Sequence, residues 1–301
     1  MDTKRTIGVV IPTIRFIESF PAFLEAWTPL FVKHNVELIV IEDGNTPLIR
    51  HYEFSSGKSQ QVYRDREINL DKENLVSNFC AGVRQLGFLY IAKHLPNVEY
   101  IFTTDDDCFP IGDTIQEHIN QLNRKVPISW LSTASDFMRG FPYQVRTEAP
   151  VMVSHGVWEG VYDWDAPSQL LKGDTKVEFY KGVIPKGIYA PICGMNLCFR
   201  REALPYIYFA PVGTFKGAER WDDIYMGIMV IKKFAELNWG IVSGYAKVLH
   251  KRASNPFTSL AKETVGILHG EEFWKDPDNY KGHPWFDEFR KKTLKWYELT
   301  K

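Results

Sequence analysis

The stretch YIFTTDDD, residues 100–107, decides how this 301-residue chain folds. Its apolar start predicts a buried strand, and three aspartates, Asp105, Asp106 and Asp107, follow at the carboxyl end of that strand. Open α/β sheets bind ligands at this end of their strands. Adjacent carboxylates repel one another unless cations or hydrogen-bond donors neutralise them, so a divalent metal holding a substrate phosphate is the expected occupant. We interpret the triplet as part of a nucleotide-sugar site, and the alternative is a solvated acidic turn.

The composition is that of a globular protein, with 45% apolar, 14% aromatic and 24% charged residues. A net charge of −1 provides no overall attraction to nucleic acid or to acidic membranes. The first apolar strand is too short for a signal-peptide core, and no stretch approaches the roughly 20 apolar residues that span a bilayer. We therefore expect a cytoplasmic protein without an integral membrane segment. The four cysteines lack C-x-x-C spacing, which favours reduced, buried thiols.

Upstream of the triplet, strand and helix patterns alternate. Apolar runs predict strands at residues 6–11 and 37–41 and, more weakly, near 62–63. Helical spacing predicts helices at residues 18–31 and 74–94. This alternation predicts an α/β fold in which helices flank a mixed, mostly parallel sheet with right-handed connections.

Downstream of the triplet, residues 128–211 lose clear periodicity and become rich in glycine, proline and aromatic residues. We expect irregular strands and loops over the site, used to recognise the sugar or an acceptor. Within them, residues 191–199 predict a strand that brings Gly194 and Asn196 close to a ligand, since glycine permits close backbone approach. An ordinary bulged core strand is the alternative.

The last third of the chain begins with a clear amphipathic helix at Asp222 and Asp223. Carboxylates suit a helix N-terminus, and we expect one of them to cap the helix while the other contacts a sugar hydroxyl or an oxocarbenium-like centre. A strand pair is predicted at residues 240–249. We assign residues 1–257 to the nucleotide-sugar domain and 258–301, with three tryptophans, to a helical extension that packs on the core or on a neighbouring subunit. Assembly into a homo-oligomer is therefore one of the alternatives.

Metal ligation is predicted for the acidic triplet. Side chains alternate along an extended segment, so Asp105 and Asp107 are expected to face one ion and Asp106 to face elsewhere, toward a ribose hydroxyl. His250 follows a predicted strand and is the expected third ligand, although a lone histidine is more often structural. The cations and small polar residues at 251–255 suit a diphosphate, and a solvated turn is the alternative.

Nucleotide binding is predicted at the ends of the first three strands, which carry Thr13, Arg15, Asp43, Gly44 and Arg64. A carboxylate there can accept from a base or ribose, and arginines offset phosphate charge. No G-x-G-x-x-G follows the first strand and no G-x-x-x-x-G-K-[ST] occurs, which disfavours NAD, flavin and P-loop chemistry. Farther along, Arg139 and Arg146 stand seven residues apart in an aromatic-rich segment, and spacing alone favours surface cations over sugar-phosphate ligands.

Several ordered segments together resemble the plant reversibly glycosylated polypeptides, a glycosyltransferase-like family that includes UDP-arabinopyranose mutases. The matching segments run over most of the chain. They are VIPTIR at 10–15, EDG at 42–44, YIFTTDDDCF at 100–109, FMRGFP at 137–142 with Arg146, SHGVW at 154–158, DAP at 165–167, IPKG at 184–187, CGMN at 193–196, RWDD at 220–223 and ASNPF at 253–257.

The resemblance implies a GT-A-type nucleotide-diphospho-sugar transferase fold with Mn²⁺ or Mg²⁺ at the triplet, and a mutase that uses neither flavin nor NAD. It also implies that Arg139 becomes reversibly glycosylated and that Arg146 is needed for activity. The matched segment around His155 adds this residue to the expected sugar-binding set. This chain departs from the family in a shorter stretch before Arg139 and in Trp221, where tyrosine is usual, so the identity of the sugar stays open.

The leading prediction is a metal-dependent mutase that interconverts the pyranose and furanose forms of a UDP-sugar, with Asp222 and Asp223 beside the two arginines in catalysis. One alternative is a retaining glycosyltransferase that passes the sugar to an external acceptor. Another is a non-catalytic subunit that binds a nucleotide sugar next to a catalytic partner. A phosphatase is disfavoured, because Phe109 stands where its Asp-x-Asp strand end has threonine.

Overall fold

The computed structural model describes residues 6–14, 16–45, 47–55, 58–65, 70–131, 136–173, 175–252 and 254–301, with only the backbone at 55 and 58–65. Arg15 and the side chain of Arg64 therefore lie outside the described residues. The strands are β1 (Thr6–Thr13), β2 (Val36–Glu42), β3 (Leu48–Ser55), β4 (Lys58–Asp65), β5 (Val98–Thr104), β6 (Cys108–Pro110), β7 (Lys125–Val126), β8 (Ala149–Gly160), β9 (Gly182–Val183), β10 (Asn196–Arg200) and β11 (Gly240–His250). The α-helices are α1 (Phe20–His34), α2 (Gln85–His94), α3 (Thr114–Leu122), α4 (Ala166–Lys172), α5 (Asp222–Leu237), α6 (Pro256–Phe273) and α7 (Trp285–Thr300).

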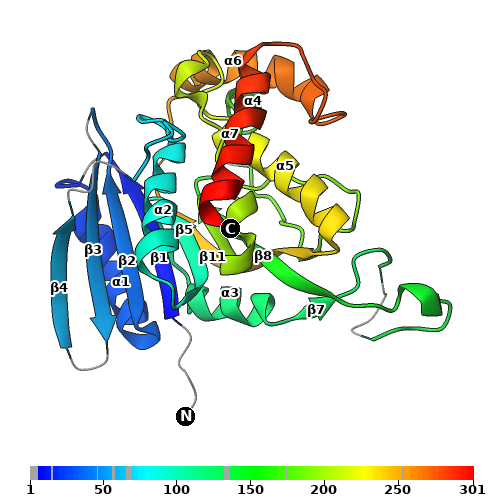
Figure 1. Cartoon of the computed structure of the whole chain (residues 1–301), viewed down its shortest axis with the longest axis horizontal. Helices are drawn as coiled ribbons and strands as arrows, with labels where there is room; N and C mark the ends of the chain where they lie inside the picture. The colour runs from blue at the N-terminus through cyan, green and yellow to red at the C-terminus, as the bar shows by residue number, and fades with distance from the viewer. Residues whose placement is uncertain are drawn as a thin grey trace.

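One mixed sheet runs through the molecule in the order β4-β3-β2-β1-β5-β10-β8-β11-β6 (Figure 1). β1 pairs in parallel with both β2 and β5, so their carboxyl ends meet at one edge, as predicted. Antiparallel strands β3 and β10 extend this parallel centre on its two sides. The α/β class is confirmed. The strand expected near residues 62–63 exists as β4, but it is the second arm of an antiparallel hairpin with β3 and does not continue the parallel set.

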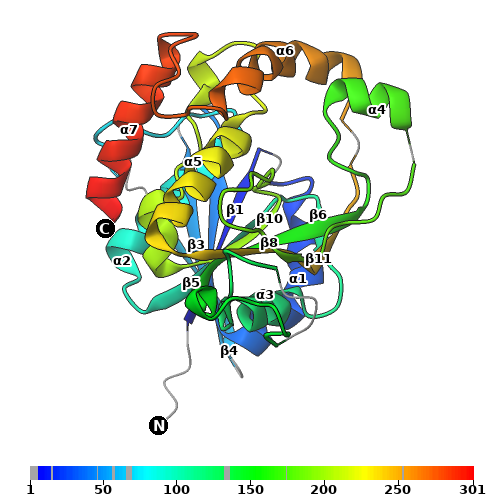
Figure 2. The same ribbon diagram turned by 90° about the vertical axis from the view of Figure 1, so that its right-hand side faces the viewer.

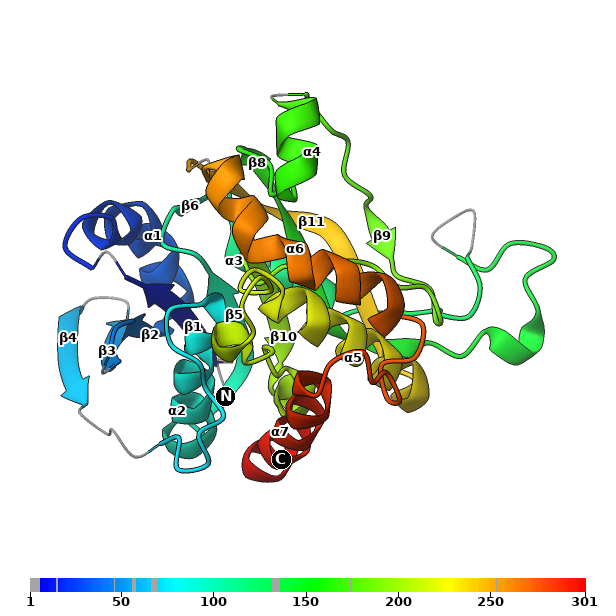
Figure 3. The same ribbon diagram turned by 90° about the horizontal axis from the view of Figure 1, so that it is seen from above.

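Both faces of the sheet are covered, which explains why β1 is apolar on both sides. Val9 and Ile11 belong to the hydrophobic cluster that includes the aromatic residues of α1, whereas Val10 belongs to the cluster that includes Phe88 of α2. α1 and α2 thus lie on opposite faces of the sheet, as the view from above shows (Figure 3). α5 also contributes to the cluster on the α2 face, and α3 contributes to the other.

The helix predicted from residue 74 begins later, at Gln85, after a short 3₁₀ turn at Ala81–Arg84. Asn74 and Phe79 have φ angles of 53° and 58°, which a right-handed helix does not allow. The carboxylate of Asp71 accepts from the backbone N–H of Leu75 at 2.7 Å and of the next residue at 2.8 Å. These local hydrogen bonds compete with the helix, so residues 74–80 form a loop beside the strand ends.

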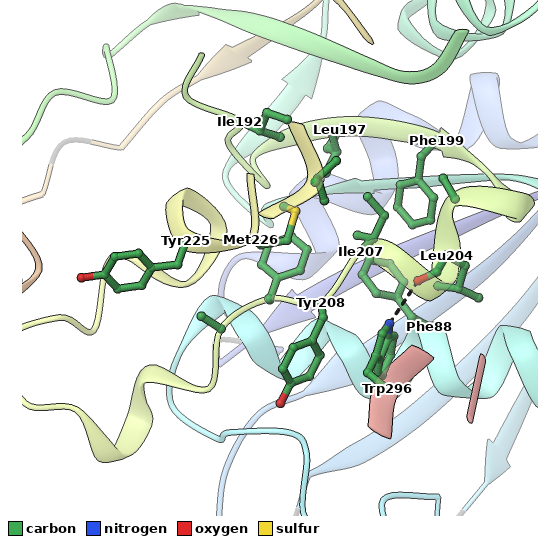
Figure 4. Packing of buried hydrophobic residues seen from close by; sticks show 14 of the residues in the cluster. Phe88, Ile192, Leu197, Phe199, Leu204, Ile207, Tyr208, Tyr225, Met226 and Trp296 are labelled. Atoms are coloured by element: carbon green, nitrogen blue, oxygen red, sulfur yellow. Dashed lines mark hydrogen bonds between the residues drawn. The ribbon is translucent and has the colours of Figure 1, made fainter. Parts of the chain in front are cut away.

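The C-terminal helices complete the hydrophobic cluster on the α2 face. Trp296 of α7 is fully buried among aromatic and aliphatic residues, and its Nε1 donates to the carbonyl of Leu204 at 3.0 Å (Figure 4). α6 and α7 also place Phe273, Trp285, Phe286 and Phe289 in this cluster. The expected strand pair at 240–249 is instead one strand, β11, with an irregularity at Gly244, where φ is 89°. Over the described residues, the structure has no helix whose length and apolar character would let it cross a bilayer.

Candidate functional site

The three aspartates occupy a turn after β5. β5 ends at Thr104, and the backbone N–H of Cys108 donates to the carbonyl of Asp105 at 3.1 Å. The expectation of an extended segment with alternating side chains is therefore wrong, and each aspartate has different neighbours. The side chain of Asp106 is only 5% exposed and accepts from the hydroxyl of Thr13, at the end of β1, at 2.6 Å. This hydrogen bond joins two of the predicted nucleotide-binding residues.

Asp105 is held by Arg84, a residue that the sequence did not single out. The side chain of Arg84 is 1% exposed, and its Nη2 donates to Asp105 at 2.7 Å. Its Nη1 donates to the carbonyl of Gly194 at 2.6 Å and to the Thr103 hydroxyl at 2.9 Å. Burial acts to lower the pKa of Arg84, but nearby carboxylates, Asp105 foremost, raise it above its usual value. A buried, charged guanidinium thus lies under the acidic turn.

Asp107 lies near His250, which comes from the far end of the chain. The Nε2 atom of His250 is 3.8 Å from a carboxylate oxygen of Asp107, too far for a direct hydrogen bond. The Nδ1 atom is 2.8 Å from the carbonyl of Val161, and because a carbonyl only accepts, Nδ1 carries a proton. In the neutral imidazole, this leaves the lone pair of Nε2 for a metal ion. Two ligands of one Mg²⁺ ion, each bonded at about 2.0–2.1 Å, lie at most about 4.2 Å apart. The pair therefore fits a shared divalent cation.

The predicted set of three metal ligands is not fully assembled. One oxygen of Asp105 is engaged by Arg84, as described above. Among the described residues, the group of three potential ligands whose donor atoms all lie within 4.8 Å of one another is Glu37, His51 and Glu53, on β2 and β3. The structure thus brings Asp107 and His250 together and gives Asp105 a different partner.

Asp43 shapes the loop at the end of β2. Its backbone N–H donates to the carbonyl of Thr13 at 2.8 Å, and its carboxylate accepts from the N–H groups of Gly44 and Phe79, both at 2.8 Å. Burial raises the pKa of Asp43, and these two N–H groups offset part of the rise. Each carboxylate oxygen keeps a second lone pair, so Asp43 can still accept from a ligand. Thr13, Asp43, Gly44 and Asp106 form one continuous group.

Asp222 and Asp223 open α5, as predicted, but the N-cap position belongs to Trp221. Asp223 accepts from the backbone N–H of Gly194 at 3.0 Å. Asp222 is 3% exposed, and within the described chain its Oδ2 atom has no hydrogen-bond partner. Burial, with the neighbouring Asp223, raises the pKa of Asp222 to about 8 against the opposing effect of Arg84, and burial raises the pKa of Asp223 to about 6. Two carboxyl groups with separated pKa values are typical of an acid and a base.

Gly194 lies between these groups. Its N–H goes to Asp223 and its carbonyl to Arg84, so its backbone connects α5 with the acidic turn. A Cβ atom there would lie 2.7 Å from the ring of Phe209 and 3.1 Å from Arg84, which explains the glycine. The predicted close backbone approach is present, although the neighbours are protein groups.

The other two predicted sugar-binding residues make hydrogen bonds inside the fold. The Asn196 amide donates to the carbonyls of Val157 and Ala246 at 3.0 and 3.2 Å and accepts from His118 at 2.8 Å. His155 accepts from the backbone N–H of Cys193 at 3.2 Å, and its other ring nitrogen bonds to a serine hydroxyl. Burial lowers the pKa of His155 to about 4, which keeps it neutral. The structure therefore gives both side chains buried protein partners, although Asn196 pairs with Thr104, directly before the acidic turn, and His155 bonds to the backbone of Cys193.

Arg139 and Arg146 lie on a protruding segment, residues 136–148, which we call the arginine arm (right of Figure 1). The arm enters β8 at Ala149, whereas His155 of β8 is level, through β10, with Thr103 of β5. Six residues of strand correspond to roughly 20 Å, so the arm starts near the opposite end of the sheet from the aspartates. Arg139 is exposed, and Arg146 stacks on Tyr143 at 3.8 Å. The structure does not bring the arginines to the acidic turn.

Comparison with known proteins adds a family to this geometry. The family model described as "Reversibly glycosylated polypeptide" matches residues 3–275. The chain is 34% identical over 290 residues to a probable UDP-arabinopyranose mutase 1 of Pisum sativum and to UDP-arabinopyranose mutase 3 of Arabidopsis thaliana, in each case with 89% of this chain and 76% of the relative covered. It is 33% identical over 295 residues to UDP-arabinopyranose mutase 1 of Oryza sativa subsp. japonica, with 91% and 76% covered.

Proposed function

The chain belongs to the reversibly glycosylated polypeptide family, and from this premise we propose that it interconverts UDP-arabinopyranose and UDP-arabinofuranose. The observation that carries the proposal is the similarity to proteins named UDP-arabinopyranose mutases over about nine tenths of the chain. The convergence of carboxylates from β5 and α5 around Arg84 supports it.

We assign the uridine and ribose of the substrate to the ends of β1 and β2. Asp43 supports this assignment because its carboxylate keeps acceptor capacity, and Thr13 lies next to it, bonded to the buried Asp106. Arg15 and Arg64 keep their predicted role as partners of the diphosphate.

We assign a divalent cation to Asp107 and His250, with Asp105 kept near by Arg84. When bound, Mn²⁺ or Mg²⁺ supplies electrostatic stabilisation of the negative charge on the departing diphosphate. The chain's own residues orient these groups: the Val161 carbonyl fixes the ring of His250, and Thr13 fixes Asp106. The proposal includes neither flavin nor NAD.

We assign the proton transfers to α5. Changing the ring size exchanges which sugar hydroxyl closes the ring, so one hydroxyl must gain a proton and another must lose one. With a pKa of about 8, Asp222 is largely protonated near neutral pH and can donate, while Asp223, with a pKa of about 6, is largely ionised and can accept. The roles of Arg139 and Arg146 stay predictions. A cytoplasmic location is also part of the proposal, and the four free cysteines support it, since free thiols are typical of a reducing compartment.

The test is to incubate the purified protein with UDP-arabinofuranose and Mn²⁺ and to resolve the products by chromatography. We expect UDP-arabinopyranose to accumulate to the same ratio from either direction. An Asp223→Asn variant is expected to lose about 10²–10⁴-fold in rate, the usual contribution of a general base. Absence of the pyranose product with the wild-type protein would overturn the proposal, and UDP release only after adding a glycan acceptor would identify a transferase.

A further inference from the structure

Arg220 lies two residues before Asp222 and connects three separate parts of the chain. Its Nη2 lies 3.1 Å from a carboxylate oxygen of Asp163, in the loop between β8 and α4. Its Nε lies 3.1 Å from Glu263 of α6, and its Nη1 donates to the Ser259 hydroxyl at 2.7 Å. Figure 2 shows α4 and α6 beside each other above the sheet. The sequence predicted no role for Arg220 or for Asp163.

Asp163 carries this connection to the site. Its second carboxylate oxygen accepts from the thiol of Cys193 at 3.4 Å, and the sulfur accepts from the backbone N–H of Met195 at 3.4 Å. The chain is therefore fixed on both sides of the Gly194 N–H group. Asp163 holds the side chain of Cys193, and Arg84 holds the carbonyl of Gly194. The N–H of Gly194 in turn holds Asp223. We define residues 193–195 as the Cys193 turn.

We propose that Arg220 and Asp163 form a positioning pair that holds the Cys193 turn and, through it, sets the place of Asp223 opposite Arg84 and Asp105. The inference rests on the proposed function, because it assigns the pair to the residue that accepts the proton. Neither residue touches the reacting atoms. The guanidinium of Arg220 orients Asp163 by one oxygen and leaves the other for the thiol, so loss of Arg220 frees the carboxylate to turn away.

The pair also balances charge around Asp223. Asp163 and Asp105 present negative charge to this carboxyl group, the protonated Asp222 and the Cys193 thiol lie beside it, and Arg84 presents positive charge. Arg220 neutralises Asp163 by direct contact. Removing Arg220 leaves the repulsion from Asp163 uncompensated, whereas removing the charge of Asp163 relieves it. Opposite shifts in the titration of Asp223 are therefore expected from the two changes.

The experiment compares Arg220→Met, Arg220→Lys, Asp163→Asn and the Met/Asn double variant by the pH profile of kcat and kcat/KM on UDP-arabinofuranose. The acid limb is the part of the profile at low pH, where the rate rises as Asp223 loses its proton. Arg220→Met is expected to move this limb to higher pH. It is also expected to lower kcat about tenfold, with a smaller change in KM, because Asp223 is misplaced after the substrate binds. Asp163→Asn is expected to move the limb to lower pH. The double variant returns the limb toward the wild-type position, and Arg220→Lys restores part of kcat.

Glu263→Gln is the matched control. Arg220 also contacts Glu263, whose other oxygen accepts from the N–H of Ala166 at 2.7 Å, so this change loosens α6 and α4 without touching the Cys193 turn. It is expected to lower the melting temperature and to leave the acid limb in place. The proposal is overturned if Arg220→Met lowers the melting temperature but leaves the limb where it is in the wild type.

A readout independent of turnover separates this inference from the proposed function. Alkylation of Cys193 by iodoacetamide, followed by peptide mass spectrometry, reports on the turn, with the buried Cys198 as internal reference. We expect Arg220→Met to speed labelling of Cys193 about tenfold or more, since the thiol loses its packed surroundings. An unchanged labelling rate defeats the positioning pair. Faster labelling in a protein with no mutase activity would retain the pair and reject the mutase.

Discussion

The guanidinium of Arg84 donates to a carboxylate, a hydroxyl and the carbonyls of Ala81 and Gly194 while almost fully enclosed by protein. The five N–H groups of the planar guanidinium serve these four acceptors, whereas the ammonium of lysine has only three N–H groups. The charge is tolerated because Asp105, Asp222 and Asp223 surround it. Burial raises the pKa of both α5 carboxyl groups, and Arg84 opposes this rise in each.

Arg84→Met is expected to destabilise the protein by about 3–5 kcal/mol, the usual effect of removing one partner of a buried ion pair. Urea unfolding measures this loss. Arg84→Lys is the matched comparison and should retain part of the stability while losing the bond to Gly194 or to Thr103. An Arg84→Met protein as stable as the wild type would show that the buried charge is unimportant.

Asp222 gives the folding stability a pH dependence with a defined sign. Its pKa is about 8 in the folded state, above the ordinary value of 3.8, so the folded protein holds a proton that the unfolded chain releases. The contribution to stability is therefore full below about pH 4 and declines as pH rises toward 8. Burial lowers the pKa of His118 and His155 to about 4, below the ordinary value of 6.5, so these two groups make stability rise with pH up to about pH 7 and oppose the trend there. Above about pH 7.5 both are neutral in the folded and the unfolded state, and the decline due to Asp222 stands alone.

We expect Asp222→Asn to remove this decline, because asparagine cannot ionise. The free energy of unfolding, measured by urea titration at intervals between about pH 7.5 and 9, should fall with pH in the wild type and less steeply in the variant. The advantage of the variant at the upper end is expected to be on the order of a few kcal/mol at most. Parallel curves for the two proteins would contradict the raised pKa.

At the scale of elements, local hydrogen bonds and tertiary contacts decided several boundaries. The apolar stripe of residues 74–94 reads as one helix, yet Asp71 and Asp43 bind the backbone of its first part and turn it into a loop around the site. Likewise, β4 pairs antiparallel with β3, although the alternation of strand and helix patterns in the sequence favoured a parallel strand. Periodicity reports which residues are buried, and it does not report which partner a backbone group will choose.

The docking of α7 makes a prediction about cooperativity. Trp296 shares a cluster with Tyr208 and Phe289, and its indole N–H bonds to the main chain. Trp296→Ala is expected to cost about 3–5 kcal/mol, as for other large buried aromatics, and Trp296→Phe less. Thermal unfolding followed by fluorescence and circular dichroism should stay a single transition. Separate unfolding of the C-terminal helices would show that residues 258–301 are an independent unit.

At the scale of the whole molecule, the candidate cation site joins the middle of the chain to its last strand. Asp107 follows β5 and His250 ends β11, and they meet because β11 pairs with β6 directly after the acidic turn. Spacing in the sequence contains no signal for this contact, since more than a hundred residues separate the two. The arginine arm leaves the same sheet far from this edge.

His250→Asn is expected to weaken Mn²⁺ binding in the presence of UDP by at least about tenfold, a loss that even outer partners of a metal ligand cause. Calorimetry or the electron spin resonance signal of free Mn²⁺ measures the affinity. His269→Asn is the matched control, since His269 bonds to Tyr280 among the C-terminal helices. Equal affinity in the wild type and His250→Asn proteins would remove His250 from the site.

The sequence by itself determined the α/β class, the strand that carries the aspartates, the start of α5 and the family, because burial patterns and ordered motifs are written locally along the chain. Tertiary structure alone decided that Arg84 lies beneath Asp105, that Asn196 and His155 turn into the core, and that Asp163 and Arg220 reach the Cys193 turn. These outcomes depend on which distant backbone and side-chain groups satisfy one another once water is excluded, and a buried polar group takes whichever partner the fold provides. The aspartates in the sequence predicted proton transfer and metal binding by carboxylates, and the packing decided which carboxylate has which neighbours.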